Sequence, residues 1–423
     1  MGTRVAIPHS GQARREARPA RRLPARGGVP PSDCRGGEHA RPRRPRRGEG
    51  TRRFAYPLRR PGPRARARTA GARGRRPKTT ARRPKDRDFL ETPEGLLFCV
   101  VGYVHPPDRY LAYVKYAPAE SGKWRRGVVA YRRQLPYYHV QHVLGTVAWL
   151  ERQHPRYVWD DPTTGLRFSF VPREAVARYY RPEARLAEIL AGPRDPLEAE
   201  VAALVDHLTR QTGLPPTTFG ITGSILLGLH DPAFSDIDLL VYGAANARAV
   251  RDAVGALTGS VLEPLPEARR ARWRAETAAR FGLGEGDVRH LERRRWNYVL
   301  FGGRYVSIHP TRRDDEIDEA YGARRFRRLG PATVAATVRD AGAAMFLPAV
   351  YGVEAAVDAQ GRPCRLEEVV SFEGLFGGSA EPGERVVAAG LLEEDQAGRR
   401  RLVVGAAGPE GGGFIRPAPA GEG

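Results

Sequence analysis

The clearest alternation of hydrophobic and polar positions lies between residues 196 and 310, where helical periods alternate with short apolar runs. Apolar residues three and four positions apart predict amphipathic helices over Pro196–Thr212, Ser224–Leu229, Ala245–Leu257 and the charged region Pro264–Arg280. Runs of strand length occupy Thr217–Ile221, Asp236–Tyr242, Asn297–Phe301 and Arg304–His309, the last two joined by Gly302-Gly303. We therefore expect an α+β domain over residues 196–329.

A smaller α+β domain is expected over residues 87–195. Gly95–Val104 and Arg109–Tyr116 read as strands joined by a Pro-Pro-Asp turn. Leu166–Val171 reads as a further strand, and Val140–Arg152 and Arg173–Leu190 read as helices. Tyrosines and arginines of this part either stack with nucleic acid or are ordinary surface residues: Tyr131, Arg132, Arg133, Tyr137 and Tyr138.

The pattern changes after Gly330, where short apolar runs are separated by glycines up to residue 417. Several short strands at this spacing predict a small β-barrel or sandwich. The stretch from Gly383 to Leu392 resembles a strand pair of an OB-type barrel.

Two aspartates near the middle of the chain carry the candidate chemistry. Asp236 and Asp238 stand two residues apart on an expected strand, so both project from one face while Ile237 and Leu239 point to the core. Adjacent carboxylates repel unless a proton or a cation neutralises one of them. Mg²⁺ (or Mn²⁺) takes such oxygens and commonly keeps substrate phosphates as further ligands. An Asp-x-Asp pair also occurs as a plain solvated strand end.

Gly223 and Ser224 open an apolar helix pattern twelve residues before Asp236. Glycine allows close backbone approach, serine can cap a helix, and a free helix N-terminus binds phosphate. The same dipeptide also occurs as an ordinary cap. Carboxylates for a metal and a helix start for phosphate together suit nucleotidyl transfer from a nucleoside triphosphate.

With Gly223-Ser224 followed by Ser235-Asp236-Ile237-Asp238, the chain resembles the polymerase-beta-type nucleotidyltransferase superfamily over roughly Val201 to Pro310. The resemblance implies a mixed sheet with helices on one side and Mg²⁺ held by Asp236 and Asp238 as catalytic residues. It also implies that Gly223 and Ser224 bind the nucleotide. The wider arrangement is similar to uncharacterised archaeal proteins with a minimal domain of this kind.

The chain departs from this family at the third carboxylate, which members with full activity carry on a later strand. On Arg304–His309 the inward polar positions are Ser307 and His309, and imidazole is a poor ligand for Mg²⁺. Asp314 and Asp315 follow and either complete the site from a loop or begin a capped helix. Without a third carboxylate the chain is a slow transferase, an enzyme with an unusual ligand, or a binding protein on a transferase fold.

The basic charge is confined to one segment. Residues 1–86 contain 27 Lys and Arg against 5 Asp and Glu, a balance equal to the net charge of +22 of the whole chain. Rich in Arg, Pro, Gly and Ala, this segment is expected to be disordered. It is either a basic arm that binds phosphate backbones or an upstream extension foreign to the natural protein, because a GC-rich genome yields such reading frames.

The sequence thus predicts a Mg²⁺-dependent nucleotidyltransferase that moves a nucleoside monophosphate from an NTP to a hydroxyl of an RNA 3′ end, a protein or a small molecule. The alternative is a catalytically silent RNA- or DNA-binding protein on the same fold. We expect no membrane partner, because no apolar run reaches ~20 residues. Three cysteines without metal spacing suit a reducing cytoplasm, which is the location expected.

Overall fold

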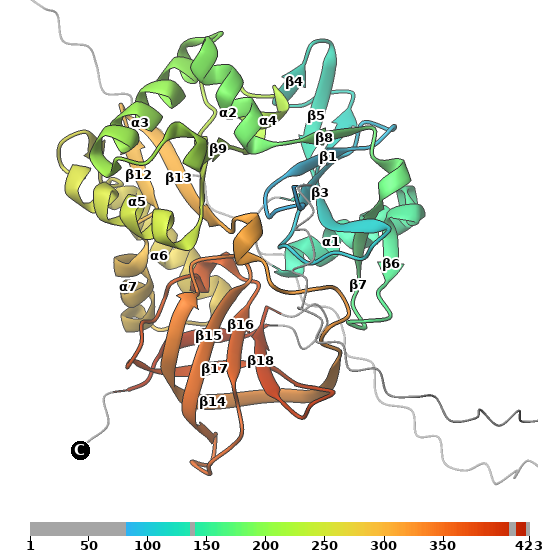
Figure 1. Cartoon of the computed structure of the whole chain (residues 1–423), viewed down its shortest axis with the longest axis vertical. Coiled ribbons are helices and arrows are strands. Elements are labelled where there is room, and N and C mark those ends of the chain that lie inside the picture. Colours follow the sequence, from blue (N-terminus) through green and yellow to red (C-terminus); the bar gives the residue numbers. More distant parts are fainter. Residues whose placement is uncertain (1–81, 136–139, 406–411, 420–423) are drawn as a thin grey trace, which may run out of the picture. The chain divides into compact units, whose positions relative to one another are not determined.

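The computed structural model describes residues 82–135, 140–405 and 412–419. The chain divides into Met1–Arg76 and Pro77–Gly423, and every described residue belongs to the second unit. Three β-sheets and seven α-helices make up the described part (Figure 1), so the α+β class is confirmed. Most of the predicted disordered segment, together with Tyr137 and Tyr138, lies outside the described residues.

The first sheet has the order β4-β5-β3-β2-β1-β8, and β7 pairs with both β3 and β6. Its strands are β1 (Phe89–Glu91), β2 (Leu97–Val100), β3 (Arg109–Ala119), β4 (Trp124–Arg126), β5 (Val129–Arg133), β6 (Val158–Asp160), β7 (Arg167–Pro172) and β8 (Arg178–Tyr180). Helix α1 (Val140–Gln153) packs against β3, β6 and β7.

The helix predicted over Arg173–Leu190 is wrong in its first half. A 3-10 turn, Arg173–Ala175, and strand β8 precede α2 (Pro182–Ala191). Proline lacks an N–H and pushes the preceding residue to extended backbone, so the helix starts at Pro182, after Arg181 at φ −109° and ψ 118°.

The second sheet has five strands in the order β11-β12-β13-β10-β9. Strands β10 and β13 are parallel and the other pairs are antiparallel, so the sheet is mixed. Its strands are β9 (Phe219–Ile221), β10 (Ile237–Tyr242), β11 (Leu262–Glu263), β12 (Tyr298–Phe301) and β13 (Arg304–Thr311).

Five more helices surround this sheet or connect its strands: α3 (Pro196–Thr212), α4 (Gly223–Leu227), α5 (Ala244–Leu257), α6 (Glu267–Phe281) and α7 (Glu285–Arg294). Helix α5 packs on β10 and β13, α3 packs on α5, and α6 packs on α7. The bounds of α3 match the prediction because Asp195 caps its start by accepting from Glu198 N and Gly213 ends it at φ +71°.

The third sheet has the order β14-β15-β16-β18-β17-β19. Because β14 also pairs with β17, five strands close into a ring, in which β16 and β18 are parallel. Its strands are β14 (Phe326–Ala343), β15 (Ala349–Asp358), β16 (Glu368–Ser371), β17 (Arg385–Asp395), β18 (Arg400–Val404) and β19 (Phe414–Pro417). Strand β14 starts at Phe326, ahead of the change of pattern at Gly330.

The described structure begins before Arg87, where order was expected to start. Arg82 Nη1 lies 2.6 Å from Asp88 Oδ2, and Lys85 Nζ lies 2.7 Å from Asp314 Oδ1. Asp88 and Lys85 are both buried. The composition of residues 82–86 does not reveal this role, because Lys85 pairs with a residue 229 positions away in the sequence.

Candidate functional site

Strand β10 presents the two predicted aspartates at its start. Asp236 directly precedes the strand and is exposed, and Asp238 is its second residue and is half-buried. Ile237 and Leu239 are fully buried in the core. The strand lies between the edge strand β9 and the central strand β13, so both carboxylates emerge at the start of an inner strand.

The loop before β10 is held rigidly. Ser235 Oγ accepts from Asp231 N at 2.9 Å, and Asp231 O accepts from Ser235 N at 2.9 Å. Arg304 on β13 donates to the carbonyls of Ser235 at 2.8 Å and Pro232 at 3.0 Å, and its guanidinium pairs with Glu200. These contacts fix the position from which Asp236 projects.

The aspartate pair lacks a basic partner. Among the described residues, no Lys or Arg nitrogen lies within 4.0 Å of either carboxylate, in a chain with 70 Lys and Arg. Although Asp236 reaches solvent, loss of surrounding water raises its pKa, and the charge of Asp238 raises it further. Two carboxylates that repel each other and have no cationic side chain in contact favour a bound cation.

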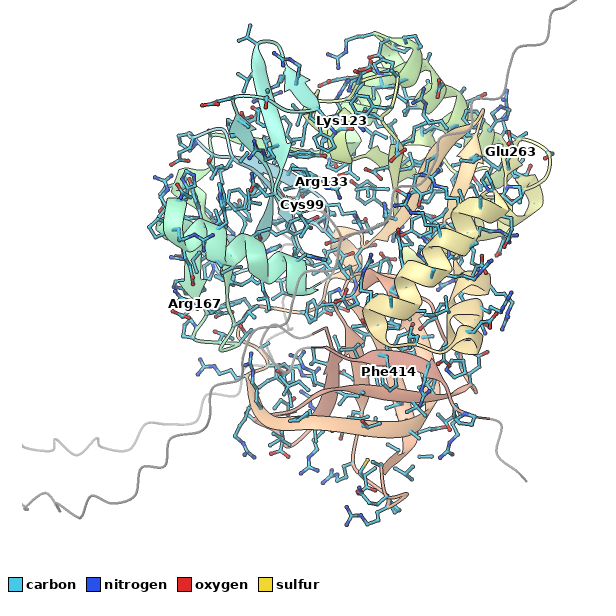
Figure 2. All side chains as sticks on the ribbon, turned by 180° about the vertical axis from the view of Figure 1, so that it is seen from behind. Cys99, Lys123, Arg133, Arg167, Glu263 and Phe414 are labelled. Atoms are coloured by element: carbon cyan, nitrogen blue, oxygen red, sulfur yellow. The ribbon has the colours of Figure 1, made fainter. Side chains whose placement is uncertain are left out.

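Three cations lie around the pair at longer range. The charges of Arg269, Lys123 and Arg304 all act to lower the pKa of Asp236. Lys123, labelled in Figure 2, comes from the loop between β3 and β4 and lies 3.8 Å over the ring of Phe234. The site therefore holds two carboxylates within a positive surrounding.

Ser307 and His309 form a hydrogen-bonded chain with Asp238. In the parallel register Ser307 stands directly opposite Asp238, and its Oγ donates to Asp238 Oδ1 at 2.5 Å. His309 Nε2 lies 2.8 Å from Ser307 Oγ. A hydroxyl has one proton, which goes to the carboxylate, so His309 is the Nε2–H tautomer and donates to serine.

His309 is neutral for a physical reason. Burial lowers its pKa well below the usual range, and the positive charges of Arg87 and Lys115 lower it further. Its Nε2 lies 4.0 Å from Asp238 Oδ1, and that nitrogen already donates to Ser307. His309 therefore orients the Asp238 side chain through Ser307 and does not offer Nε2 to a metal.

Gly223 lies against Asp238. Its φ is +68°, and a Cβ built on it would stand 2.3 Å from Asp238 Oδ2. The backbone at the start of α4 thus approaches the carboxylate in a way that only glycine permits.

The prediction that Ser224 caps the helix is wrong, because the N-cap residue is Thr222 and Ser224 lies in the first turn of α4. Thr222 N donates to Asp238 O at 2.9 Å, and Thr222 Oγ1 donates to Arg87 O at 2.8 Å. The helix has only five residues.

Asp314 and Asp315 are not brought to the pair. They follow β13 in a 3-10 turn, Asp314–Glu316, beyond the pairing of Thr311 with Tyr242 at the far end of β10. Five residues separate Ile237 from Tyr242 on the strand, which is about 16 Å at ~3.3 Å per residue. Asp314 accepts from Lys85 Nζ, and Asp315 pairs with Arg313.

A second acidic cluster has a structural explanation. One ligand atom each of Asp195, Glu198 and His230 lies within 4.8 Å of the others. Glu198 already pairs with Arg185 and Arg194. Asp195 Oδ2 accepts from His230 Nε2, and Asp195 Oδ1 accepts from Glu198 N at the start of α3. Arginines, His230 and helix capping satisfy the two carboxylates of this cluster without a metal.

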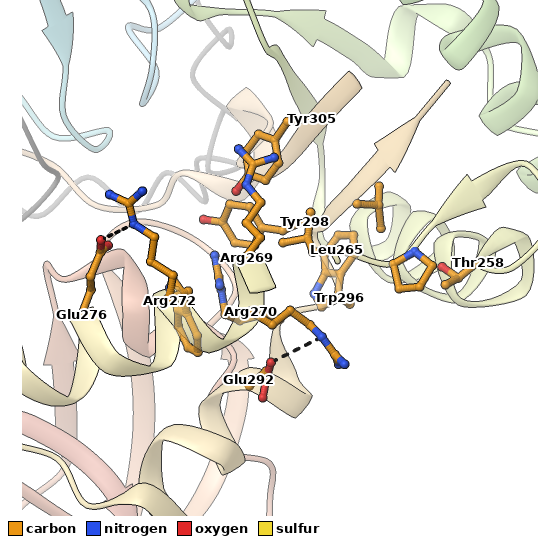
Figure 3. Close-up of a pocket in the computed structure, with 14 residues that line it drawn as sticks. Thr258, Leu265, Arg269, Arg270, Arg272, Glu276, Glu292, Trp296, Tyr298 and Tyr305 are labelled. Atoms are coloured by element: carbon orange, nitrogen blue, oxygen red, sulfur yellow. Dashed lines mark hydrogen bonds and ion pairs between the residues drawn. The ribbon is translucent and has the colours of Figure 1, made fainter. Parts of the chain in front are cut away.

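A cavity of about 470 Å³ opens beside the site, lined by residues of α6, α7, β12 and β13 (Figure 3). Tyr305 and Arg269 belong both to this cavity and to the surroundings of the aspartates. The charge of Asp238 contributes to the raised pKa of Tyr305, after the larger effect of burial. Sequence reasoning missed α7 and the cavity, although the basic-aromatic run from Arg293 to Tyr298 was a visible signal.

Comparison with known proteins gives one informative match. No family model matches the chain, and no solved structure matches it. The uncharacterized protein MJ1086 of Methanocaldococcus jannaschii is 31% identical over 333 residues, covering 75% of this chain and 94% of that protein. The chain belongs to the family of this protein.

The match covers nearly all of the archaeal relative and three quarters of this chain. The relative's name states no activity, and function is therefore argued from the site. Across the described residues, every helix is too short or too polar to cross a membrane.

Proposed function

We propose that this protein is a divalent-metal-dependent nucleotidyltransferase of the polymerase-beta type, which transfers a nucleoside monophosphate from an NTP to a hydroxyl. The observation that carries the proposal is the Asp236–Asp238 pair, which has no basic partner within 4.0 Å in the described part of the chain and whose Asp238 lies against a glycine that leaves room for it. The mixed five-stranded sheet, with the pair at the start of its inner strand β10, supports the same assignment.

The donor set suits Mg²⁺ or Mn²⁺, because it consists of carboxylate oxygens with a serine hydroxyl beside them. Asp236 and Asp238 would hold the ion. When bound, such an ion makes the attacking hydroxyl more acidic and offsets charge on the transferred phosphate.

The protein's own groups have separate roles. Gly223 and Ser224 bring backbone close to Asp238, where the phosphates of the NTP would lie. The positive charges of Lys123, Arg269 and Arg304 act on Asp236 and favour a polyanion at the aspartate pair. Ser307 and His309 keep Asp238 Oδ1 in a fixed orientation.

Ser307 stands where a third carboxylate would be expected, directly opposite Asp238. This arrangement supports a second candidate, a catalytically silent nucleic-acid-binding protein. The ring of five strands with one parallel pair also favours this candidate, because OB-type barrels of five strands bind oligonucleotides.

Turnover of labelled NTPs by the full chain with Mg²⁺ or Mn²⁺ separates the two candidates. Asp236→Asn and Asp238→Asn should lower nucleotidyl transfer by about 100-fold or more, since even the partners of metal ligands are worth about 10- to 100-fold. Their melting temperatures should stay level or rise slightly, because repulsion between the carboxylates is relieved.

Asp252→Asn, on the exposed surface of α5, is the matched control and should keep wild-type turnover. Absence of transfer from any NTP, together with metal-dependent NTP binding that neither asparagine variant alters, would exclude the enzyme and leave the silent binding protein.

A further inference from the structure

The cavity lies on one side of the aspartates. Gly223, beside which the NTP phosphates are proposed to bind, lies on the other side. In the sheet order, Gly223 follows β9, Asp238 lies on β10, Tyr305 lies on β13 and Tyr298 lies on β12. Tyr298 pairs in register with Ser307, the residue that bonds Asp238. A line along the sheet therefore runs from the phosphate side, across the carboxylates, to the cavity.

Planar groups in the cavity wall form a continuous stack. The guanidinium of Arg269 lies 4.2 Å over the ring of Tyr305, and the rings of Tyr305 and Tyr298 stack with centroids 6.0 Å apart and planes at 27°. Arg295 lies 4.0 Å over Tyr298 and 4.1 Å over Trp273. Figure 3 shows Arg269 beside Tyr305, with Tyr298 next to them. We name this set the arginine-aromatic stack.

Both arginines of the stack keep an unused charge. Among the described residues, neither Arg269 nor Arg295 has a carboxylate within 4.0 Å, whereas the neighbouring Arg270 pairs with Glu267 at 2.5 Å. Stacking uses the faces of a guanidinium and leaves its N–H groups pointing outward in the plane. A cavity wall with such donors is suited to phosphate oxygens.

The geometry of nucleotidyl transfer places the molecule that carries the attacking hydroxyl in the cavity. In an in-line displacement, the attacking oxygen and the leaving oxygen lie on opposite sides of the phosphorus atom. The new bond joins the acceptor oxygen to the α-phosphorus, the bond to the bridging oxygen breaks, and pyrophosphate leaves with that electron pair. With pyrophosphate on the Gly223 side, the acceptor hydroxyl enters from the cavity side, and its proton passes to solvent.

We infer that the cavity binds the unpaired end of a single-stranded nucleic acid, whose terminal hydroxyl is the acceptor. The inference rests on the proposed function. Phosphates of the strand meet the N–H edges of Arg269 and Arg295, and an unpaired base extends the arginine-aromatic stack. Bases of a duplex are already stacked and paired, so a free strand end fits where a duplex does not.

The test uses the full chain, EDTA and no NTP, with a short single-stranded RNA that carries 4-thiouridine at its 3′ end. Excess duplex RNA occupies the Arg-rich residues 1–86. After irradiation, the cross-linked peptide should contain Tyr298 or Trp273. Tyr298→Ala and Arg295→Ala should lower this cross-link about tenfold, the scale of one lost stacking contact.

Two matched variants separate binding from general effects. Arg293→Ala removes one exposed charge from α7 outside the cavity and should leave the cross-link unchanged. Tyr298→Phe keeps the ring and should also bind as the wild type does, which assigns a loss in Tyr298→Ala to the ring and not to the hydroxyl. An unchanged melting temperature of Tyr298→Ala excludes misfolding as the cause.

Cross-links found only in residues 1–86 or only on the third sheet would overturn the inference, and so would an equal loss in Arg293→Ala. Nucleotide transfer to a polypeptide without a cavity cross-link would overturn it and leave the proposed function intact. A cavity cross-link in a protein that never turns over an NTP would instead remove the proposed function and keep the strand site.

Discussion

At the scale of single residues, the candidate site depends on a glycine that has no space for a side chain. Gly223 has φ +68°, and a Cβ would stand 2.3 Å from Asp238 Oδ2. Gly228, at the end of the same short helix, has φ +65° but no atom within 4 Å of its built Cβ. The two glycines share the backbone conformation and differ only in what lies beside them.

This pair gives a matched prediction. Gly223→Ala and Gly228→Ala should each lose about 1–2 kcal/mol of unfolding free energy, the cost of alanine in the left-handed region. Only Gly223→Ala should also lose metal-dependent NTP binding, because the methyl group displaces the Asp238 carboxylate. Denaturant unfolding and NTP titration with Mg²⁺ measure the two effects, and equal NTP affinity in both variants would contradict the role given to Gly223.

At the scale of elements, sequence reasoning placed the strand with Asp236 and Asp238 and the paired strand with Ser307 and His309. It succeeded there because side chains on a strand alternate between its two faces, which shows as a two-residue repeat in the sequence, and because Gly302-Gly303 marks a hairpin turn. It failed at α7, whose ten residues carry few apolar positions, and at Ser224, since capping depends on backbone angles that the sequence does not show.

The rest of the site depends on contacts between distant parts of the chain. Arg304 reaches the loop before β10, and Lys123 reaches the same loop from the first sheet. No period or motif in one sequence predicts such contacts. The Asp314 hypothesis fails for the same reason, because nearness in sequence to His309 does not bring a side chain back along the strand.

Arg304 links strand β13 to the loop that presents Asp236. Its planar guanidinium donates to two carbonyls and pairs with Glu200, a geometry that a lysine ammonium cannot reproduce. Arg304→Lys should therefore lower nucleotidyl transfer about tenfold or more, in the range found for partners of metal ligands. The control Arg251→Lys lies on α5 away from the loop, and matching losses in the two variants would refute a positioning role.

At the scale of the whole molecule, buried ionisable groups couple folding to pH. Burial and, to a smaller extent, the charge of Arg173 lower the pKa of His105 to about 4. Below pH 6.5 the His105 imidazole binds a proton in the unfolded chain but stays neutral in the folded protein. The free energy of unfolding therefore decreases as pH falls toward 4. Burial raises the pKa of Asp86 to about 6, and its contribution runs the opposite way in an overlapping window.

Because Asp86 titrates in an overlapping range, the His105 contribution is measured as the difference in unfolding free energy between the wild type and a His105 variant. In His105→Asn the amide oxygen can accept from Leu111 N in place of Nδ1, which is 3.1 Å away. The stability advantage of the wild type over this variant should be constant above pH 7 and shrink by up to about 3 kcal/mol between pH 6.5 and 4. Urea unfolding across that range measures it, and a difference independent of pH would rule out His105 as the titrating group.

The boundary of the folded part gives the last prediction. The change of composition places it after residue 86, but Arg82 makes two hydrogen bonds, of 2.6 and 2.7 Å, to the fully buried Asp88 and also pairs with Glu183. Removing Arg82 leaves a buried carboxylate without its partner, which typically costs about 3–5 kcal/mol. A protein lacking residues 1–81 should keep the unfolding free energy of the full chain, whereas one lacking residues 1–86 should lose about 3 kcal/mol or more. Asp88→Asn in the shorter protein should restore part of that loss, because the amide carries no charge. Equal stability of the two truncated proteins would show that Arg82–Asp86 contribute nothing to the fold.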